Sequence, residues 1–187
     1  MTLAPWRPAL AQALHRNRAR VDCRYLQLAT INTEGKPSNR TVVFRGFVEE
    51  ALQMVTDGRS EKVQQIQMNP WAEACWYFTV TREQFRLAGQ LTLIGPDNDP
   101  GDLRQKAWQA MSDQARQQFY WPQPGQSRSN ANAFEPTTVS MEHPTDSFSV
   151  LLLTPERVDH LALRGHPQDR HIYERGAGEW TVQAVNP

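Results

Sequence analysis

The chain has 187 residues, with 20 lysines and arginines against 20 aspartates and glutamates, so its formal net charge is zero. This length fits one domain, residues 1–187, with a well-buried core. The balanced charge disfavours nucleic acid and membrane surfaces as partners, since both attract a basic excess.

The N-terminal segment, residues 1–20, is expected to form a short amphipathic helix. Trp6, Leu10 and Leu14 recur at helical spacing. The arginines at 16–20 are interpreted as a solvated helix end, because no aromatic residues interleave with them as they do in a nucleic-acid patch. No apolar run approaches the length of a membrane-spanning helix, and the segment lacks the pattern of a secretory signal. We therefore expect a cytoplasmic protein.

Two extended runs follow, over 25–32 and 37–48, and the turn-forming residues 33–36 lie between them. This pattern predicts a β-hairpin. Side chains alternate across a strand. The second run therefore presents Arg40, Val42 and Phe44 on one face and Thr41, Val43 and Arg45 on the other.

A further strand is predicted over 51–56, before a helix. Ser60 is placed as the N-cap of this helix, which ends at Asn69 before a proline. Val63 and Ile66 supply its buried stripe. Two longer strands are predicted next, over 72–81 and 84–94, around a tight turn at Arg82-Glu83.

Residues 99–119 are polar but carry apolar side chains spaced for one buried helix face, with an interruption near Ser112-Asp113. The stretch 122–146 is rich in Pro, Ser, Asn and Thr and predicts a long loop, and loops of this length are often functional. Four closing strands are expected at 147–155, 157–163, 171–175 and 180–185.

These strands, with few helices, predict a mostly β protein with flanking α-helices, built as a closed or partly closed antiparallel barrel. The motifs narrow the chemistry. The chain contains no GxGxxG, GxxxxGK[ST] or GxSxG pattern. The five histidines and two cysteines show no metal-type spacing, so no metal site is expected.

Two stretches do predict a site. Residues 37–47 form a strand with an inward arginine, and residues 56–62 turn from a strand end into a helix start bearing Ser, Arg and Lys. Two basic groups and several backbone N–H donors would then converge at a place where a phosphate could bind. A phosphorylated cofactor is the hypothesis that this arrangement favours, although each stretch alone is typical of an ordinary protein surface.

These residues resemble the FMN-binding split-barrel proteins related to pyridoxamine 5′-phosphate oxidase, most closely the branch described as Alr4036-type. The resemblance covers about residues 20–187 and rests on six elements in the family's order. They are the strand 40–45, the T-x-x-x-S-x-K turn 56–62, the isoleucine-containing helix ending in Asn69-Pro70, Gln84 after a strand turn, the Gln126-Ser127 pair, and Asp169-Arg170-x-x-Tyr173.

The resemblance implies an FMN-binding split β-barrel that forms a homodimer with FMN at the subunit interface. Arg40 and Lys62 match phosphate-binding residues, Val55 and Thr56 match positions at the ribityl chain and ring edge, and Gln84 matches an amide that bonds the ring. Gln126, Ser127 and Arg170 match contacts that come largely from the second subunit. The full set of expected FMN contacts is Arg40, Thr41, Val42, Val43, Val55, Thr56, Arg59, Ser60, Lys62, Gln84, Gln126, Ser127 and Arg170.

The chain also departs from the family pattern. The helix-start arginine just before Lys62 is Glu61, and Arg59 is the candidate to replace it. The basic residue that contacts the pyridoxal phosphate is Arg45 rather than Lys. The signature Trp is Leu161, and the Arg-Leu-His motif is replaced by His166-Pro167-Gln168, which leaves Arg45 and His166 as weak substrate-binding candidates.

The resemblance therefore implies an FMN-dependent oxidoreductase with an unassigned small-molecule substrate and no identified catalytic acid or base. Two alternatives stay open. One is a non-catalytic protein that binds or senses FMN. The other is a true pyridoxamine/pyridoxine 5′-phosphate oxidase with a divergent substrate pocket.

Overall fold

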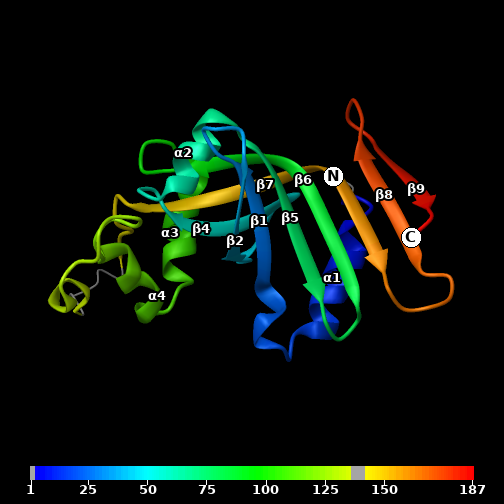
Figure 1. Cartoon of the computed structure of the whole chain (residues 1–187), viewed down its shortest axis with the longest axis horizontal. Helices are drawn as coiled ribbons and strands as arrows, with labels where there is room; N and C mark the ends of the chain where they lie inside the picture. Colours follow the sequence, from blue (N-terminus) through cyan, green and yellow to red (C-terminus); the bar gives the residue numbers. More distant parts are fainter. Residues whose placement is uncertain (1–2, 136–141) are drawn as a thin grey trace.

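Within residues 3–135 and 142–187, which the computed structural model describes, nine strands form one antiparallel sheet (Figure 1). The strands are β1 (Tyr25–Ile31), β2 (Pro37–Val43), β3 (Gly46–Val48), β4 (Ala51–Asp57), β5 (Trp71–Phe78), β6 (Glu83–Ile94), β7 (Phe148–Ala162), β8 (Asp169–Arg175) and β9 (Trp180–Val185). The α-helices are α1 (Arg7–Asn17), α2 (Glu61–Met68), α3 (Leu103–Gln109) and α4 (Asp113–Gln117), and short 3₁₀ turns occupy Val21–Arg24, Pro100–Asp102, Gln118–Tyr120 and Ala131–Phe134.

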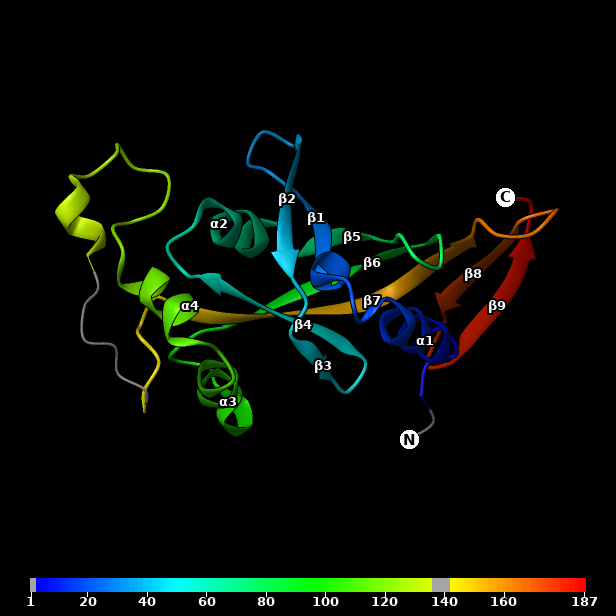
Figure 2. The ribbon, with the colours of Figure 1, turned by 90° about the horizontal axis from the view of Figure 1, so that it is seen from below.

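The strand order is β2-β1-β5-β6-β7-β4-β3, and the β8–β9 hairpin pairs with the far half of β7. The sheet curls into a half-open barrel with flanking helices, so the predicted mostly β split barrel is confirmed. Seen from below, α1 and the β8–β9 hairpin lie at one end of the molecule, and α3 and α4 lie at the other (Figure 2). No helix in the described part of the chain is long and apolar enough to cross a membrane.

An aromatic chain fills the main core. Phe44, Trp76, Phe78 and Phe85 follow one another with ring centroids 4.9, 5.1 and 5.8 Å apart. Helix α1 and the Trp6 residue that precedes it cover this core, with Trp6 and Leu10 fully buried, which confirms the predicted amphipathic helix. A second cluster beneath α3 and α4 contains Trp108, Met111, Phe148 and Val150.

The predicted strand over 37–48 is two strands in the structure. The β1–β2 hairpin forms as expected, and Arg40 lies opposite Leu28. After β2 the chain bends at Gly46, whose φ of +141° favours glycine, and β3 pairs with β4 instead. The single long strand was therefore wrong, because a residue with a left-handed backbone lies inside it.

The two strands predicted at 147–155 and 157–163 are one continuous strand, β7. The register of β6 against β7 shifts between Ala88 and Gly89: Ala88 pairs with Arg157 and Gly89 with Pro155, so β7 bulges at the residue between them. Gly89 approaches so closely that an added Cβ would lie 2.0 Å from the Thr154 carbonyl oxygen. The bulge accommodates a proline that lacks a backbone donor, so the strand continues through it.

The other predicted elements agree with the structure more closely. The interruption near residue 112 is confirmed, because α3 ends at Gln109 and the Ser112 hydroxyl caps α4 by accepting from the Ala115 backbone N–H. The predicted loop 122–146 holds the 3₁₀ turn Ala131–Phe134 in its described part, and residues 136–141 lie outside the described residues.

Candidate functional site

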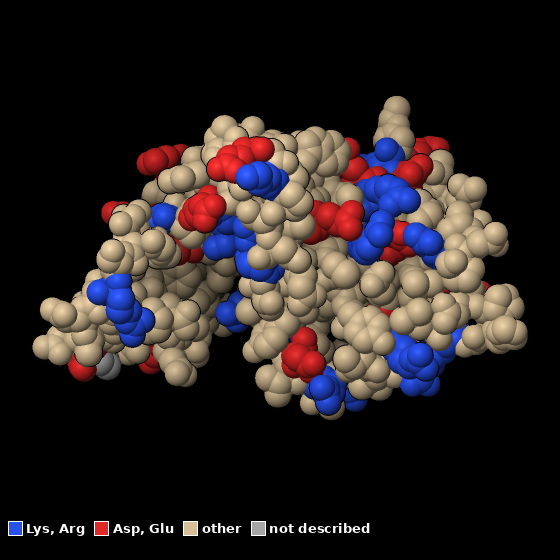
Figure 3. Space-filling view, in the orientation of Figure 1, with Lys and Arg blue, Asp and Glu red and all other residues tan. Residues whose placement is uncertain are grey.

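A cavity of about 460 Å³ lies where β2, the end of β4 and α2 face the segment from α4 to residue 124. The space-filling view shows the molecule hollowed between the α3–α4 end and the rest of the sheet, with Lys and Arg atoms in the hollow (Figure 3). We name it the Arg40–Lys62 cavity. Its lining is Arg40, Thr41, Val42, Val43, Arg45, Val55, Thr56, Asp57, Lys62, Met111, Ala115, Gln118, Phe119, Trp121 and Pro124.

Arg40 enters this cavity because strand alternation turns it inward with Val42 and Phe44. Its guanidinium donates to the Leu28 carbonyl oxygen at 3.1 Å, to Thr30 Oγ1 at 2.5 Å and to Gln65 Oε1 at 3.0 Å. Every one of these acceptors is neutral. Burial lowers the pKa of Arg40, and the charge of Glu61 partly offsets that effect.

Lys62 lies in the first turn of α2. Its Nζ donates to Thr56 Oγ1 at 2.9 Å and to Ser60 Oγ at 3.1 Å. Ser60 occupies the predicted N-cap position, but its hydroxyl donates to the Asp57 carbonyl oxygen at 2.7 Å and makes no capping bond. Burial and the nearby charge of Arg40 lower the pKa of Lys62. Two partly buried cations thus lie beside two hydroxyl groups.

This arrangement fits a dianionic ligand. Among residues 3–135 and 142–187, neither Arg40 nor Lys62 forms an ion pair within 4 Å. A phosphate ester would supply the missing negative charge and would accept from arginine, lysine and hydroxyl donors. The cavity also has apolar walls from Val55, Met111 and Phe119, and a mostly apolar slot with a few polar groups is typical of a cofactor site.

Arg59 does not join this cavity. Its guanidinium pairs with Asp57, with Nη2 2.7 Å from Oδ2, and also donates to the Trp121 carbonyl oxygen at 3.0 Å. The bond to Asp57 raises the pKa of Arg59. Arg59 lines a separate cavity of about 730 Å³ together with Val63, Leu93 and other residues.

The remaining predicted contacts lie elsewhere in the chain. Gln84 on β6 is opposite Leu161 on β7, which is opposite Arg170 on β8. Since facing residues of neighbouring strands share a face, Gln84 and Arg170 lie on one face two strand spacings apart, roughly 10 Å. Strand β8 is at the end of the molecule away from α4 (Figure 1).

Arg170 is held by a buried carboxylate. Its Nε and Nη2 donate to Asp159 at 3.0 and 2.8 Å, and this pairing lowers the pKa of Asp159. Gln126 and Ser127 are exposed in the loop after residue 121, where they line a small pocket of about 260 Å³. His166 is exposed in the turn between β7 and β8.

The sequence interpretation missed two residues that support the site, Thr30 and Gln65. Both are buried, and both contact the Arg40 guanidinium. Gln65 also donates to Glu61 Oε1, one helical turn earlier, at 2.8 Å. The sequence did hold a sign of Gln65, because it lies beside Ile66 in the buried stripe of a short helix. A glutamine buried there needs a hydrogen-bond partner. Within the described residues, no group of three or more His, Cys, Asp or Glu side chains is placed to hold a metal ion.

Comparisons with known proteins agree with this picture. Residues 3–95 match the family model described as the FMN-binding domain of pyridoxamine 5′-phosphate oxidase. The chain is 38% identical over 196 residues to pyridoxine/pyridoxamine 5′-phosphate oxidase 2 of Arabidopsis thaliana, an alignment that covers 99% of this chain and 98% of the relative.

Solved structures show the same fold. A pyridoxamine 5′-phosphate oxidase-related, FMN-binding protein from Nostoc punctiforme is 55% identical, with a TM-score of 0.95 over 100% of both chains. PhzG from Burkholderia lata, solved with tetrahydrophenazine-1-carboxylic acid, is 19% identical with a TM-score of 0.84, covering 100% of this chain and 94% of PhzG. The latter likeness concerns the fold alone.

Proposed function

We propose that this chain, which belongs to the pyridoxamine 5′-phosphate oxidase family of FMN-binding split-barrel proteins, binds FMN in the Arg40–Lys62 cavity. One observation carries the proposal: two partly buried cations, Arg40 and Lys62, have only neutral hydrogen-bond partners within the described structure. A partly buried cation without a carboxylate in direct contact is costly. A phosphate dianion removes that cost.

In this proposal Arg40, Lys62 and the hydroxyls of Thr56 and Ser60 hold the phosphate. The β2 and β4 residues Thr41, Val42, Val43 and Val55 line the route from the phosphate into the cavity. When bound, FMN supplies hydride transfer to and from a small molecule. The chain's own residues bind and orient the cofactor, and the apolar walls exclude water from it.

The second part of the proposal is a homodimer that completes the site. Gln84 and Arg170 lie on a different part of the sheet from the cavity, and Gln126 and Ser127 lie in an exposed loop. If these residues contact FMN, they do so from a second subunit. The sheet face that carries Gln84 also exposes Tyr77 and other large side chains, as an interface requires.

We propose an FMN-dependent oxidoreductase with an unassigned substrate as the activity. The pyridoxamine 5′-phosphate oxidase alternative is supported by the likeness to the Arabidopsis oxidase and by Arg45, which lines the cavity. Against it, Leu161 replaces the signature Trp, and His166-Pro167-Gln168, of which His166 is exposed, replaces the Arg-Leu-His motif. The non-catalytic alternative is supported by Asp57. This carboxylate lines the cavity, but it is paired with Arg59 and so is not free to act as a catalytic acid or base.

The test begins with the absorbance spectrum of the purified protein and with affinities for FMN and riboflavin. FMN is expected to bind far more tightly, because only FMN carries the phosphate. Equal affinities would overturn the phosphate assignment.

Hydrogen peroxide release is then measured with pyridoxamine and pyridoxine 5′-phosphates. We expect weak turnover, and a specificity constant of about 10⁴ M⁻¹s⁻¹ or above would establish the oxidase alternative instead. Flavin reduction by NADH or NADPH, without turnover of either vitamer, would identify a reductase. Absence of all these reactions would favour the non-catalytic binder.

A further inference from the structure

Arg59 makes a compact set of contacts at the end of β4. Its Nε and Nη2 donate to the two carboxylate oxygens of Asp57 at 3.0 and 2.7 Å, and its backbone N–H donates to Asp57 Oδ1 at 2.8 Å. Nη2 also donates to the carbonyl oxygen of Trp121, 62 residues further along the chain, at 3.0 Å. The side chain therefore joins the scaffold to a distant segment.

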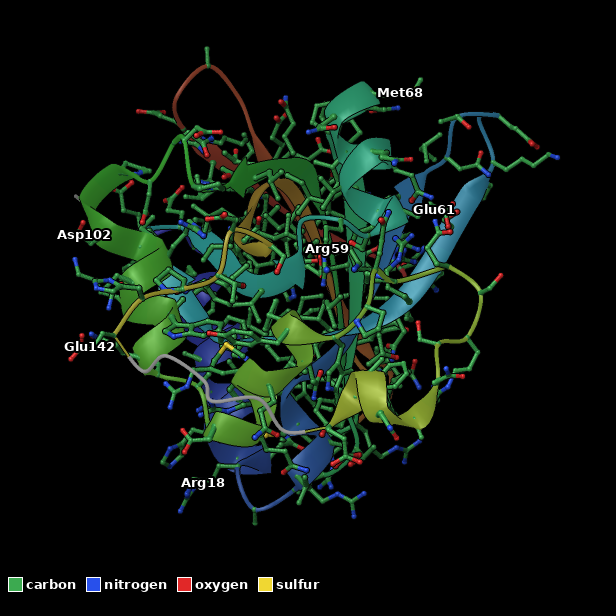
Figure 4. The ribbon with its side chains drawn as sticks, turned by 90° about the vertical axis from the view of Figure 1, so that its left-hand side faces the viewer. Arg18, Arg59, Glu61, Met68, Asp102 and Glu142 are labelled. Carbon is green, nitrogen blue, oxygen red and sulfur yellow. The ribbon has the colours of Figure 1, made fainter. Side chains whose placement is uncertain are left out.

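These contacts direct Arg59 away from the Arg40–Lys62 cavity. A bidentate pair with a carboxylate fixes a guanidinium in both position and plane. Asp57 lines the cavity, whereas Arg59 lines the separate cavity on the side of Val63 and Leu93. Figure 4 labels Arg59 near the centre of its view and Glu61 beside the start of α2.

The segment that Arg59 reaches is a wall of the Arg40–Lys62 cavity. Gln118, Phe119, Trp121 and Pro124 all line it. The first half of this wall is anchored, since the Phe119 ring packs on Trp108 and Phe148 and the Phe119 carbonyl oxygen accepts from Ser147 Oγ at 2.9 Å.

The second half of the wall makes its aromatic contacts with the loop that follows it. Trp121 packs edge-to-face on Phe134, and Arg128 lies over the same ring. Both contacts are within the loop itself. The bond from Arg59 to the Trp121 carbonyl oxygen ties this part of the wall to the end of β4.

We infer that Arg59 is a positioning residue that fastens the cavity wall 118–124 to the end of β4 through Asp57, and that it does not bind the FMN phosphate. The inference rests on the proposed FMN site. Removal of Arg59 loosens the wall against the whole cofactor, so FMN and riboflavin are affected alike. Removal of a phosphate ligand would instead weaken FMN alone.

The experiment compares Arg59→Gln and Asp57→Asn with the wild-type protein. The matched control is Arg20→Gln, because Arg20 makes the same kind of pair with Asp22 two residues away, at 3.2 Å, in an exposed turn. Hydrogen exchange of the apo-protein reports on the amides of residues 118–121 and 123, since 122 and 124 are prolines. Quenching of flavin fluorescence gives the Kd for FMN and for riboflavin, and thermal unfolding confirms that each variant is folded. Arg59→Lys replaces the glutamine variant if that one does not fold.

We expect the amides of residues 118–121 and 123 to exchange faster in Arg59→Gln and in Asp57→Asn, and not in the control. Both Kd values should rise by a similar factor, about tenfold, since a bond from a charged donor is lost. A rise for FMN alone would show that Arg59 binds phosphate, and so would tighter FMN binding in Asp57→Asn, which frees the guanidinium. Unchanged exchange would also overturn the inference. If the wild-type protein fails to bind FMN, the proposed function falls, while the exchange measurement still decides the role of Arg59.

Discussion

Arg40→Ala is the sharpest test of the proposed phosphate site. The variant removes a guanidinium that faces neutral partners only, so it removes a charge that is available to the ligand. A hydrogen bond to a charged group contributes about 1.5–3 kcal/mol. The Kd for FMN should therefore rise by roughly 10- to 150-fold.

The same substitution has a smaller cost in the free energy of unfolding. It removes a donor from Thr30 Oγ1 and from Gln65 Oε1, which are both buried. These two side chains also bond to each other at 2.6 Å, so the Gln65 oxygen keeps one partner. The loss should be about 1 kcal/mol, at the low end for an unpaired buried acceptor. Arg40→Ala is therefore expected to fold.

Fluorescence titrations with FMN and riboflavin measure the loss of phosphate binding. Urea unfolding of the apo-protein measures the loss of stability. The matched control is Lys36→Ala, which removes an exposed cation from the turn of the same hairpin. We expect riboflavin affinity to change little in either variant. The reasoning is refuted if Arg40→Ala weakens riboflavin as much as FMN, or if FMN affinity is unchanged.

Other predictions concern pH, assembly and packing. The folded-state pKa of Lys62 lies below its ordinary value of 10.5. At pH values between the two, the unfolded chain holds more protons than the folded chain. The free energy of unfolding of the apo-protein should therefore increase as pH rises through this window. Bound phosphate favours the charged amine, so FMN affinity should fall over the same window, and titrations of Lys62→Met should show neither effect. Sedimentation should give a species near twice the chain mass of 21.4 kDa, and a monomer that holds FMN tightly would contradict the proposed interface site. Gly89→Ala should lower the free energy of unfolding by about 3 kcal/mol, because its Cβ would meet the Thr154 oxygen at 2.0 Å, whereas Gly95→Ala, with its nearest atom at 3.6 Å, should change little in urea unfolding.

Local patterns allowed much of the fold to be predicted. The alternation of Arg40, Val42 and Phe44 depends only on the two-residue period of a strand, so their shared inward face was correct. The start of α2 at Ser60 was likewise visible, because a helix start is encoded within a few residues. The convergence of Arg40 and Lys62 followed from these two elements together.

Long-range pairing was not predictable in the same way. Two strands were expected at 147–155 and 157–163, but they form one strand because Gly89 on the neighbouring strand allows a bulge. Thr30 and Gln65 were missed as partners of Arg40, since they come from a different strand and a helix.

The different positions of the Arg59 and Lys62 side chains show most clearly what could not be predicted from the sequence. The two residues are three positions apart in sequence, and both were expected to contact the phosphate. The sequence alone identified their charges and their place at a helix start. Only the tertiary structure decided where each points. Asp57 and the Trp121 carbonyl oxygen draw Arg59 to one side, while Thr56 and Ser60 hold Lys62 on the other. Strand alternation and helix capping are local properties of the chain, whereas the partner that a long, flexible side chain finds depends on which distant segments the fold brings within reach.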